Sequence, residues 1–171
     1  MSVYVGVRDV VSVRGADAAA YLQGQISQDV DGLVVGSSAW SLVLQPQGKV
    51  DAWFRITRRG PNEFLLDVDP GFGELLMARL QRFLLRMALE LELATWDHHV
   101  HDTDVSVDAP VVAPAANGRG VDVIAPELAV APEPRLSVNA HERLRILAGV
   151  PSMGAELDES TIPAEAGIVP G

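Results

Sequence analysis

The stretch "LVLQPQGKVDAWFRI", residues 42–56, places a carboxylate, an aromatic ring and a cation at alternate positions. If residues 50–57 form a strand, Asp51, Trp53 and Arg55 point to one face, because successive side chains of a strand alternate. Together these three groups would suit a small-molecule ligand. They would equally suit a partly exposed sheet face with one ordinary ion pair, which is the more common situation for such residues.

Two further cations stand close together in a segment with helical periodicity. Arg79 and Arg82 lie on a different side of the expected helix from its apolar stripe, which consists of Phe72, Leu76, Leu80 and Phe83. Guanidinium groups could receive the anionic tail of a ligand. Arginines on the surface of a helix usually have no ligand, so this pair by itself indicates no site.

The segment "WDHHVHD", residues 96–102, gathers histidines and carboxylates. On a strand, Asp97, His99 and His101 point the same way, and two neutral imidazoles with a carboxylate can bind zinc or a similar ion. The alternative is a strand that runs into a loop with exposed histidines. We favour this second interpretation and predict no metal site.

The composition of the chain argues against several classes of function. The chain of 171 residues is 48% hydrophobic, which predicts one folded domain, and it has no cysteine, which excludes disulfides and thiolate chemistry. Its formal charge of −10 argues against binding nucleic acid or an anionic membrane, and a small anionic ligand would need a local basic pocket. The start has no signal-peptide pattern and no segment is apolar enough to span a bilayer, so we expect a cytoplasmic protein.

Both strands and helices are expected along the chain, and they must position these residues. Strands are expected over residues 3–13, 39–44, 50–57, 63–68, 89–93 and 121–124, and helices over 17–24, 72–84 and 139–148, the last capped by Asn139. Gln45 to Gly48 fits a type I turn, and residues 102–117 predict a loop with one short strand. Because strands and helices do not alternate regularly, the fold class is α+β, with antiparallel meanders packed with helices.

The order of several motifs resembles a known family. "GADAAAYLQGQISQDV" is followed by "LVLQPQGKVDAWFRI", "FLLDVD", "RFLLRMALELEL" and, near the C-terminus, "RLRILAGVPSMGAELDESTIPAEAG". This series resembles the folate-binding domain of the glycine-cleavage T-protein (aminomethyltransferase) superfamily, and more closely its YgfZ-type branch. The resemblance covers residues 8–96 and 118–166, and it implies a fold that binds tetrahydrofolate.

The chain departs from the family in two places. T-protein members carry an Asp-Asp pair after the glycine turn, and the second Asp is catalytic, whereas this pair reads Asp51-Ala52. YgfZ-type members continue into a Lys-Gly-Cys-Tyr-x-Gly-Gln-Glu signature and a β-barrel, which this chain lacks. The departures predict a reduced member without aminomethyltransferase activity, since position 52 offers no acid or base.

The resemblance also implies folate-contacting positions. A pterin presents an N–H and an amino group that a carboxylate can accept as a pair. The segment "GRGVDVIAP" resembles the family's Gly-Tyr-Glu segment and places Asp122 at the position of the pterin-binding Glu. The alternative for Asp122 is a solvent-facing residue on an edge strand. His141 stands where the family has a folate-contacting Arg.

The sequence therefore predicts a tetrahydrofolate-binding protein, linked to one-carbon metabolism or to iron–sulfur protein maintenance. Asp51, Trp53, Arg55, Asp122 and His141 are its predicted ligand-binding residues, with no catalytic residue. We expect one domain over residues 1–171, with a first half at 1–96 and a shortened second half at 97–171. The alternative is an interaction or assembly module of the same fold that has lost its pocket and acts as a homodimer or with a protein partner.

Overall fold

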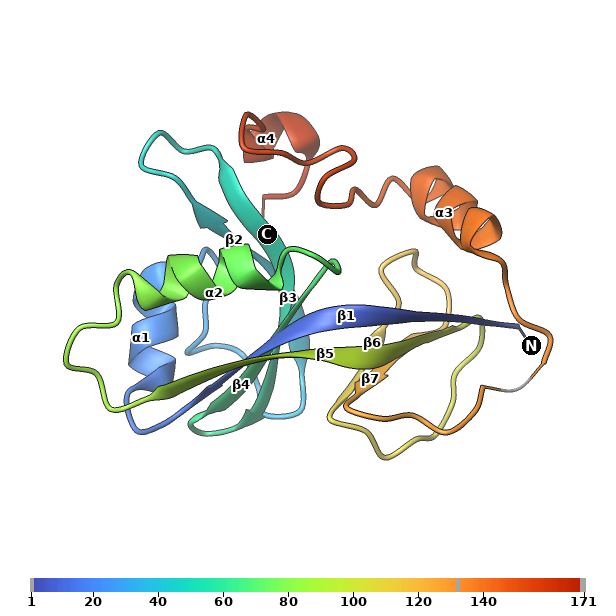
Figure 1. Ribbon diagram of the computed structural model, residues 1–171, viewed down its shortest axis with the longest axis horizontal. Coiled ribbons are helices and arrows are strands. Elements are labelled where there is room, and N and C mark those ends of the chain that lie inside the picture. Colours follow the sequence, from blue (N-terminus) through green and yellow to red (C-terminus); the bar gives the residue numbers. More distant parts are fainter. Residues whose placement is uncertain (1, 132, 170–171) are drawn as a thin grey trace. The chain divides into compact units, whose positions relative to one another are not determined.

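The computed structural model describes residues 2–131 and 133–169 (Figure 1). Helices and antiparallel strands are mixed, which confirms the α+β class. The strands are β1 (Val3–Arg14), β2 (Ser38–Leu44), β3 (Val50–Gly60), β4 (Glu63–Val68), β5 (Glu90–His101), β6 (Val111–Pro114) and β7 (Val121–Ala125). The helices are α1 (Ala18–Gln25), α2 (Gly73–Gln81), α3 (Val138–Leu147) and α4 (Pro163–Ala166).

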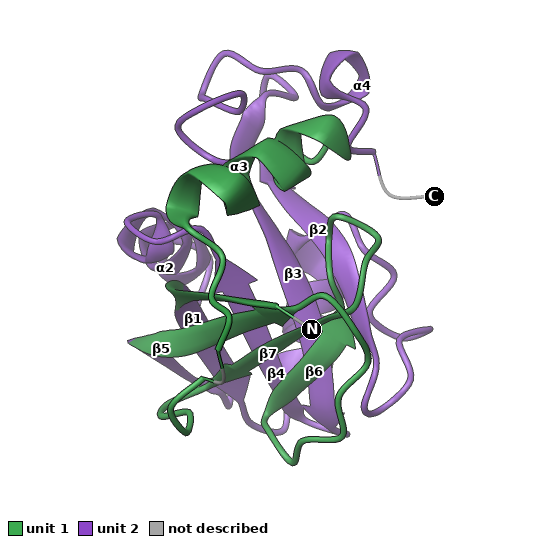
Figure 2. Ribbon diagram, turned by 90° about the vertical axis from the view of Figure 1, so that its right-hand side faces the viewer, with its two compact units in different colours: residues 1–8, 95–151 green, residues 9–94, 152–171 purple. Residues whose placement is uncertain are grey.

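The chain divides into two compact units, coloured separately in Figure 2. Unit 1 comprises Met1–Arg8 and Thr95–Pro151, and unit 2 comprises Asp9–Ala94 and Ser152–Gly171. Strands β1 and β5 each contribute residues to both units. The predicted halves at 1–96 and 97–171 stay a prediction about domain organisation.

Unit 2 is built on the antiparallel meander β2-β3-β4, with β1 beside β4. The predicted turn between β2 and β3 is present, since the Gly48 amide donates to the Gln45 carbonyl oxygen at 2.9 Å. Helix α1 packs against β4 and α2 packs against β3. These contacts cover a core whose largest fully buried side chains include Leu22, Phe54, Ile56, Phe64, Leu66, Leu76 and Leu80.

A buried ion pair lies at the centre of this meander. Arg55 on β3 is the cross-strand partner of Asp67 on β4. Its Nε and Nη2 atoms donate to the two carboxylate oxygens at 3.0 and 3.2 Å, and the side chains are 3% and 0% exposed. The ring of Trp40, the β2 partner of Arg55, stacks on Trp53 at 4.1 Å and lies 5.5 Å from the Arg55 guanidinium. The partly exposed face predicted for Trp53 and Arg55 is therefore wrong, because both are buried in these contacts.

Helix α2 is held at its start and near its end. The carboxylate of Asp9 on β1 accepts hydrogen bonds from the Gly71 and Gly73 amides at 2.8 and 3.1 Å, which caps the helix from another element. Further along, Leu80 is fully buried and its carbonyl oxygen accepts a hydrogen bond from the Tyr21 hydroxyl. The helix ends at Gln81, earlier than predicted, so Phe83 lies beyond it and is 47% exposed.

Unit 1 contains the antiparallel strands β5, β7 and β6, with β7 in the middle. His98, His99 and His101 on β5 are buried, so the prediction of exposed histidines is wrong. Asp122 is 5% exposed on the central β7, which corrects the alternative that placed it in solvent on an edge strand.

Helix α3 of unit 1 begins earlier than predicted. Ser137 caps it by accepting a hydrogen bond from the Ala140 amide at 3.2 Å, so the cap predicted at Asn139 is wrong. No residue of α3 is buried.

The Arg55–Asp67 pair predicts a large effect of removing one charge. In Asp67→Asn the Arg55 charge stays buried without its carboxylate, so we expect a loss of about 3–5 kcal/mol of unfolding free energy. Urea denaturation followed by circular dichroism measures this loss. The double variant Arg55→Met/Asp67→Leu should be more stable than Asp67→Asn, because neither charge remains; equal stability of the two would contradict the explanation.

Candidate functional site

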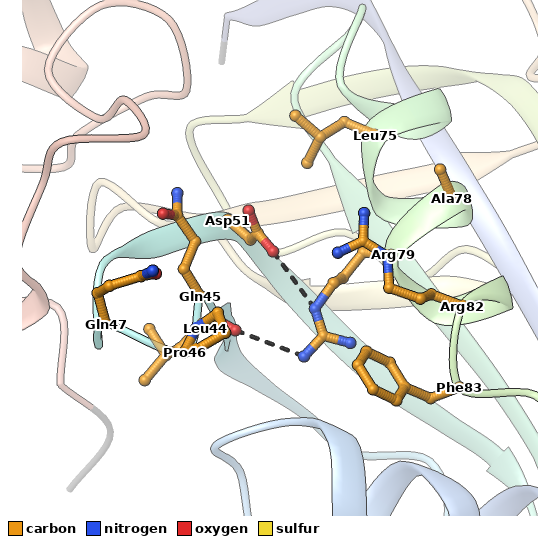
Figure 3. A pocket seen from close by; sticks show the side chains of 10 residues that line it. All are labelled: Leu44, Gln45, Pro46, Gln47, Asp51, Leu75, Ala78, Arg79, Arg82 and Phe83. Carbon is orange, nitrogen blue, oxygen red and sulfur yellow. Dashed lines mark hydrogen bonds and ion pairs between the residues drawn. The ribbon is translucent and has the colours of Figure 1, made fainter.

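A pocket of about 580 Å³ lies in unit 2 between the β2–β3 turn and α2 (Figure 3). Its polar and charged lining comes from the turn and the start of β3 on one side and from two arginines of the α2 segment on the other. The lining residues are Leu44, Gln45, Pro46, Gln47, Asp51, Leu75, Ala78, Arg79, Arg82 and Phe83. The volume falls within the range of about 300–1,000 Å³ typical of small-molecule sites.

Asp51 reaches this pocket from an irregular point of β3. The register between β2 and β3 shifts where Val43 pairs with Ala52 and Leu44 pairs with Val50, so Asp51 is left without a cross-strand partner on β2. This is the pattern of a β-bulge, which bends a strand and redirects a side chain. Trp53 and Arg55, predicted to share its face, do not line the pocket.

Arg79 is the cation that faces Asp51 in Figure 3. Its Nε lies 3.3 Å from Asp51 Oδ2, and its Nη2 donates to the Leu44 carbonyl oxygen at 3.4 Å. Its Nη1 donates to the side-chain oxygen of Gln25 at 3.4 Å, and its guanidinium lies 4.4 Å from the ring centre of Phe83. Arg79 thus connects α2 to α1, β2 and β3.

Arg82 lines the same pocket but, unlike Arg79, does not use its side-chain donors in contacts with other described residues. It is exposed at the C-cap of α2, and its side chain has no ion pair or hydrogen bond with any other residue that the structure describes. Asp51 and Arg79 neutralise each other, so Arg82 gives the lining a net positive charge in a chain of formal charge −10. This is the local basic pocket that an anionic ligand requires.

Two other predicted site residues, Asp122 and His141, meet in a cluster within unit 1. Asp122 Oδ1 lies 3.1 Å from His98 Nε2. The ring of His141 stacks on Tyr4 at 3.8 Å with an interplanar angle of 5°, and Tyr4 meets His98 edge-on at 6.3 Å. The structure therefore brings Asp122 and His141 into one cluster through His98 and Tyr4. Their ligand-binding role stays a prediction.

Three histidines of unit 1 have a lowered pKa. Burial, followed by repulsion from His101, lowers the pKa of His99, and burial likewise lowers the pKa of His101. Burial and then repulsion from His98 lower the pKa of His141. In the described part of the chain, the buried Nδ1 atoms of His101 and His141 have no hydrogen-bond partner.

The described residues contain neither a cluster of metal ligands nor a membrane-spanning helix. Across residues 2–131 and 133–169, no three histidine, aspartate or glutamate side chains gather closely enough to hold a metal ion. None of the helices in this part of the chain has the length and apolar character needed to cross a membrane.

The fold has a counterpart among solved structures. The crystal structure of glycine cleavage system aminomethyltransferase T from Bartonella henselae matches 57% of this chain with a TM-score of 0.52 and 17% identity. Over that part, the two proteins are similar in fold. At this identity the likeness concerns the fold and not the activity.

Sequence comparison gives a shorter match. A stretch of 87 residues, 51% of this chain, is 29% identical to an uncharacterized protein of Haemophilus influenzae. No family model matches the chain. The matches span 31% of the Haemophilus protein and 29% of the Bartonella chain, so both are much longer than the region they share with this one.

Of the ten lining residues, only Asp51 is among the predicted ligand-binding residues, and Arg79 and Arg82 were considered only as contacts of an anionic tail. Gln45 and Gln47 were treated only as turn residues, although their alternation with Pro46 in a turn before a carboxylate could have drawn attention to them. The sequence analysis does not single out Leu75 and places Phe83 in the apolar stripe of a helix, yet the two residues are 43% and 47% exposed and line the pocket.

Arg79 should contribute to stability. Arg79→Gln removes the ion pair with Asp51 and shortens the side chain that reaches Leu44, so we expect a loss of about 1–2 kcal/mol of unfolding free energy. Thermal and urea unfolding measure this loss. Arg82→Gln is the matched control, since Arg82 has no such partners among the described residues; an equal loss in both variants would contradict the assignment.

The lowered histidine pKa values predict acid sensitivity. Because the folded state disfavours protonated His99, His101 and His141, the unfolded chain binds more protons as the pH falls below their ordinary value of 6.5. Stability should therefore be full above pH 6.5 and decline as the pH falls from there. Urea denaturation between pH 5.0 and 7.5 measures the slope, and His101→Leu should reduce it. An unchanged slope in that variant would rule out a contribution from His101.

Proposed function

We propose that this protein binds a tetrahydrofolate-type ligand in the pocket between the β2–β3 turn and α2, and that it does not transfer aminomethyl groups. The observation that carries the proposal is the composition of the pocket. It combines apolar walls, the Asp51 carboxylate and an excess of one cation, within an acidic protein. A folate needs each of these, because it joins a hydrogen-bonding ring system to an anionic tail.

The fold likeness to an aminomethyltransferase supports a ligand of the folate class, and the ordered sequence motifs support it independently. On those motifs we also propose that the protein is a YgfZ-type member, with a role in one-carbon metabolism or in the maintenance of iron–sulfur proteins. The alternative, a module without a pocket, is less well supported, because unit 2 has a pocket lined by a carboxylate and arginines.

Position 52 supports the absence of transfer activity. The resemblance matches it to the catalytic aspartate of T-proteins, but Ala52 carries only a methyl group and is fully buried. No acid, base or charge-stabilising group is therefore supplied from this position.

Titration with 5-formyltetrahydrofolate tests the proposal. We expect a saturable heat signal, and at ligand concentrations of 100 Kd a gain in unfolding free energy of about 2.7 kcal/mol. No heat and no thermal shift with millimolar ligand would overturn the binding proposal. An aminomethyl-transfer assay with tetrahydrofolate should give no product, and turnover would overturn the second part.

A variant whose pocket is blocked tests where the ligand binds. Ala78→Trp should fill the pocket and abolish binding, because Ala78 lies on its wall. Gln81→Trp adds the same ring at an exposed position of α2 outside the lining and should bind as the wild type does. Equal binding by both variants would mean that the ligand binds elsewhere.

A further inference from the structure

We infer that Arg82 binds the anionic group of the ligand, and that Arg79, one turn earlier, has only a structural role in the pocket. This inference rests on the proposed function and adds the residue that determines specificity. It also narrows the ligand class to a heterocyclic compound that carries one or more carboxylates, bound more tightly as the number of carboxylates increases.

The donors of Arg79 are already used within the protein. Its Nε faces Asp51, its Nη1 donates to Gln25 and its Nη2 donates to Leu44. The face of its guanidinium lies against Phe83, and its side chain is only 15% exposed. A ligand carboxylate that took Arg79 would have to compete with Asp51 and break contacts that hold α2 against its neighbours, so such binding is disfavoured.

Arg82 has its donors available. Its guanidinium forms no hydrogen bond or ion pair with a described residue, yet it lines the pocket. Figure 3 shows the side chains of both arginines extending from the α2 segment toward the pocket. A carboxylate can replace water on Arg82 without breaking any contact of the protein. The planar group can also form two parallel hydrogen bonds to that carboxylate.

The position of Arg82 also explains how its charge is tolerated when no ligand is bound. It caps the C-terminus of α2, where the helix dipole favours a cation. The free protein therefore tolerates this charge without a carboxylate partner. The remaining charges of the lining, Asp51 and Arg79, neutralise each other. Discrimination between anionic and neutral ligands consequently depends on Arg82.

The experiment compares two ligands, and then a triglutamate form of the first, against three variants by isothermal titration of the full chain. One ligand is 5-formyltetrahydrofolate, and the other is a tetrahydropterin that lacks the aminobenzoylglutamate tail. Arg82→Gln should weaken binding of the first about five- to tenfold, the range for an exposed charge-assisted pair, and leave binding of the second unchanged. Arg82→Lys should recover part of the loss, because it keeps the charge but not the planar fork.

The matched control is Arg86→Gln. Arg86 is exposed, has no described partner and does not line the pocket, so its loss changes the net charge equally without removing a pocket donor. We expect binding by this variant to stay within about twofold of wild type, since Arg86 does not line the pocket and the charge of an exposed side chain is screened in 0.15 M salt. A triglutamate form of the ligand should bind wild type more tightly than the monoglutamate, and Arg82→Gln should reduce this difference.

The outcomes separate the two proposals. If wild type binds 5-formyltetrahydrofolate and Arg82→Gln binds it equally well, the role of Arg82 is overturned and the proposed function stands. If Arg82→Gln weakens both ligands to the same degree, Arg82 does not recognise the tail and the inference is again wrong. If wild type binds neither ligand, the proposed function falls, and the inference about Arg82 falls with it.

Discussion

The buried pair between Arg55 and Asp67 is the interaction on which the architecture of unit 2 depends. Each charge compensates the desolvation of the other, so neither residue is stable in that position alone. The pair fixes Arg55 opposite Asp67, and a slip of one residue would move every core side chain of β3 to the opposite face of the sheet. Because β4 leads into α2 within a few residues, the same register determines where α2 begins and which of its residues reach β3.

A local break in the neighbouring register, between β2 and β3, places Asp51 at the candidate site. With strict alternation, Asp51 would belong to the same surface as Trp53 and Arg55. The shift beside Leu44 separates them: Trp53 and Arg55 pack with Trp40 and Asp67, whereas Asp51 faces Arg79. The regular part of β3 thus supplies stability, and its irregular start supplies a carboxylate to the pocket.

Local patterns in the sequence predicted the elements well, but they predicted the surroundings of the polar residues poorly. The alternation of β3 and the Pro-Gln-Gly turn depend on neighbouring residues, so both were recognised. The buried contact between His98 and Asp122 joins two strands, and the two residues are 24 positions apart in the sequence. No local pattern contains such a contact. The shift at Asp51 was missed for a related reason, because a bulge is defined by the partner strand and not by the bulged residue.

The geometry around position 52 separates this position from the pocket. Asp51 and Ala52 are adjacent, but Asp51 is 25% exposed at the pocket whereas Ala52 is fully buried beside Val43. A carboxylate at position 52 would have to be accommodated on the buried side, so its presence or absence need not alter the pocket lining. An alanine at position 52 is therefore compatible with the proposed ligand site, in which Asp51 and Arg79 contact each other and Arg82 lines the pocket.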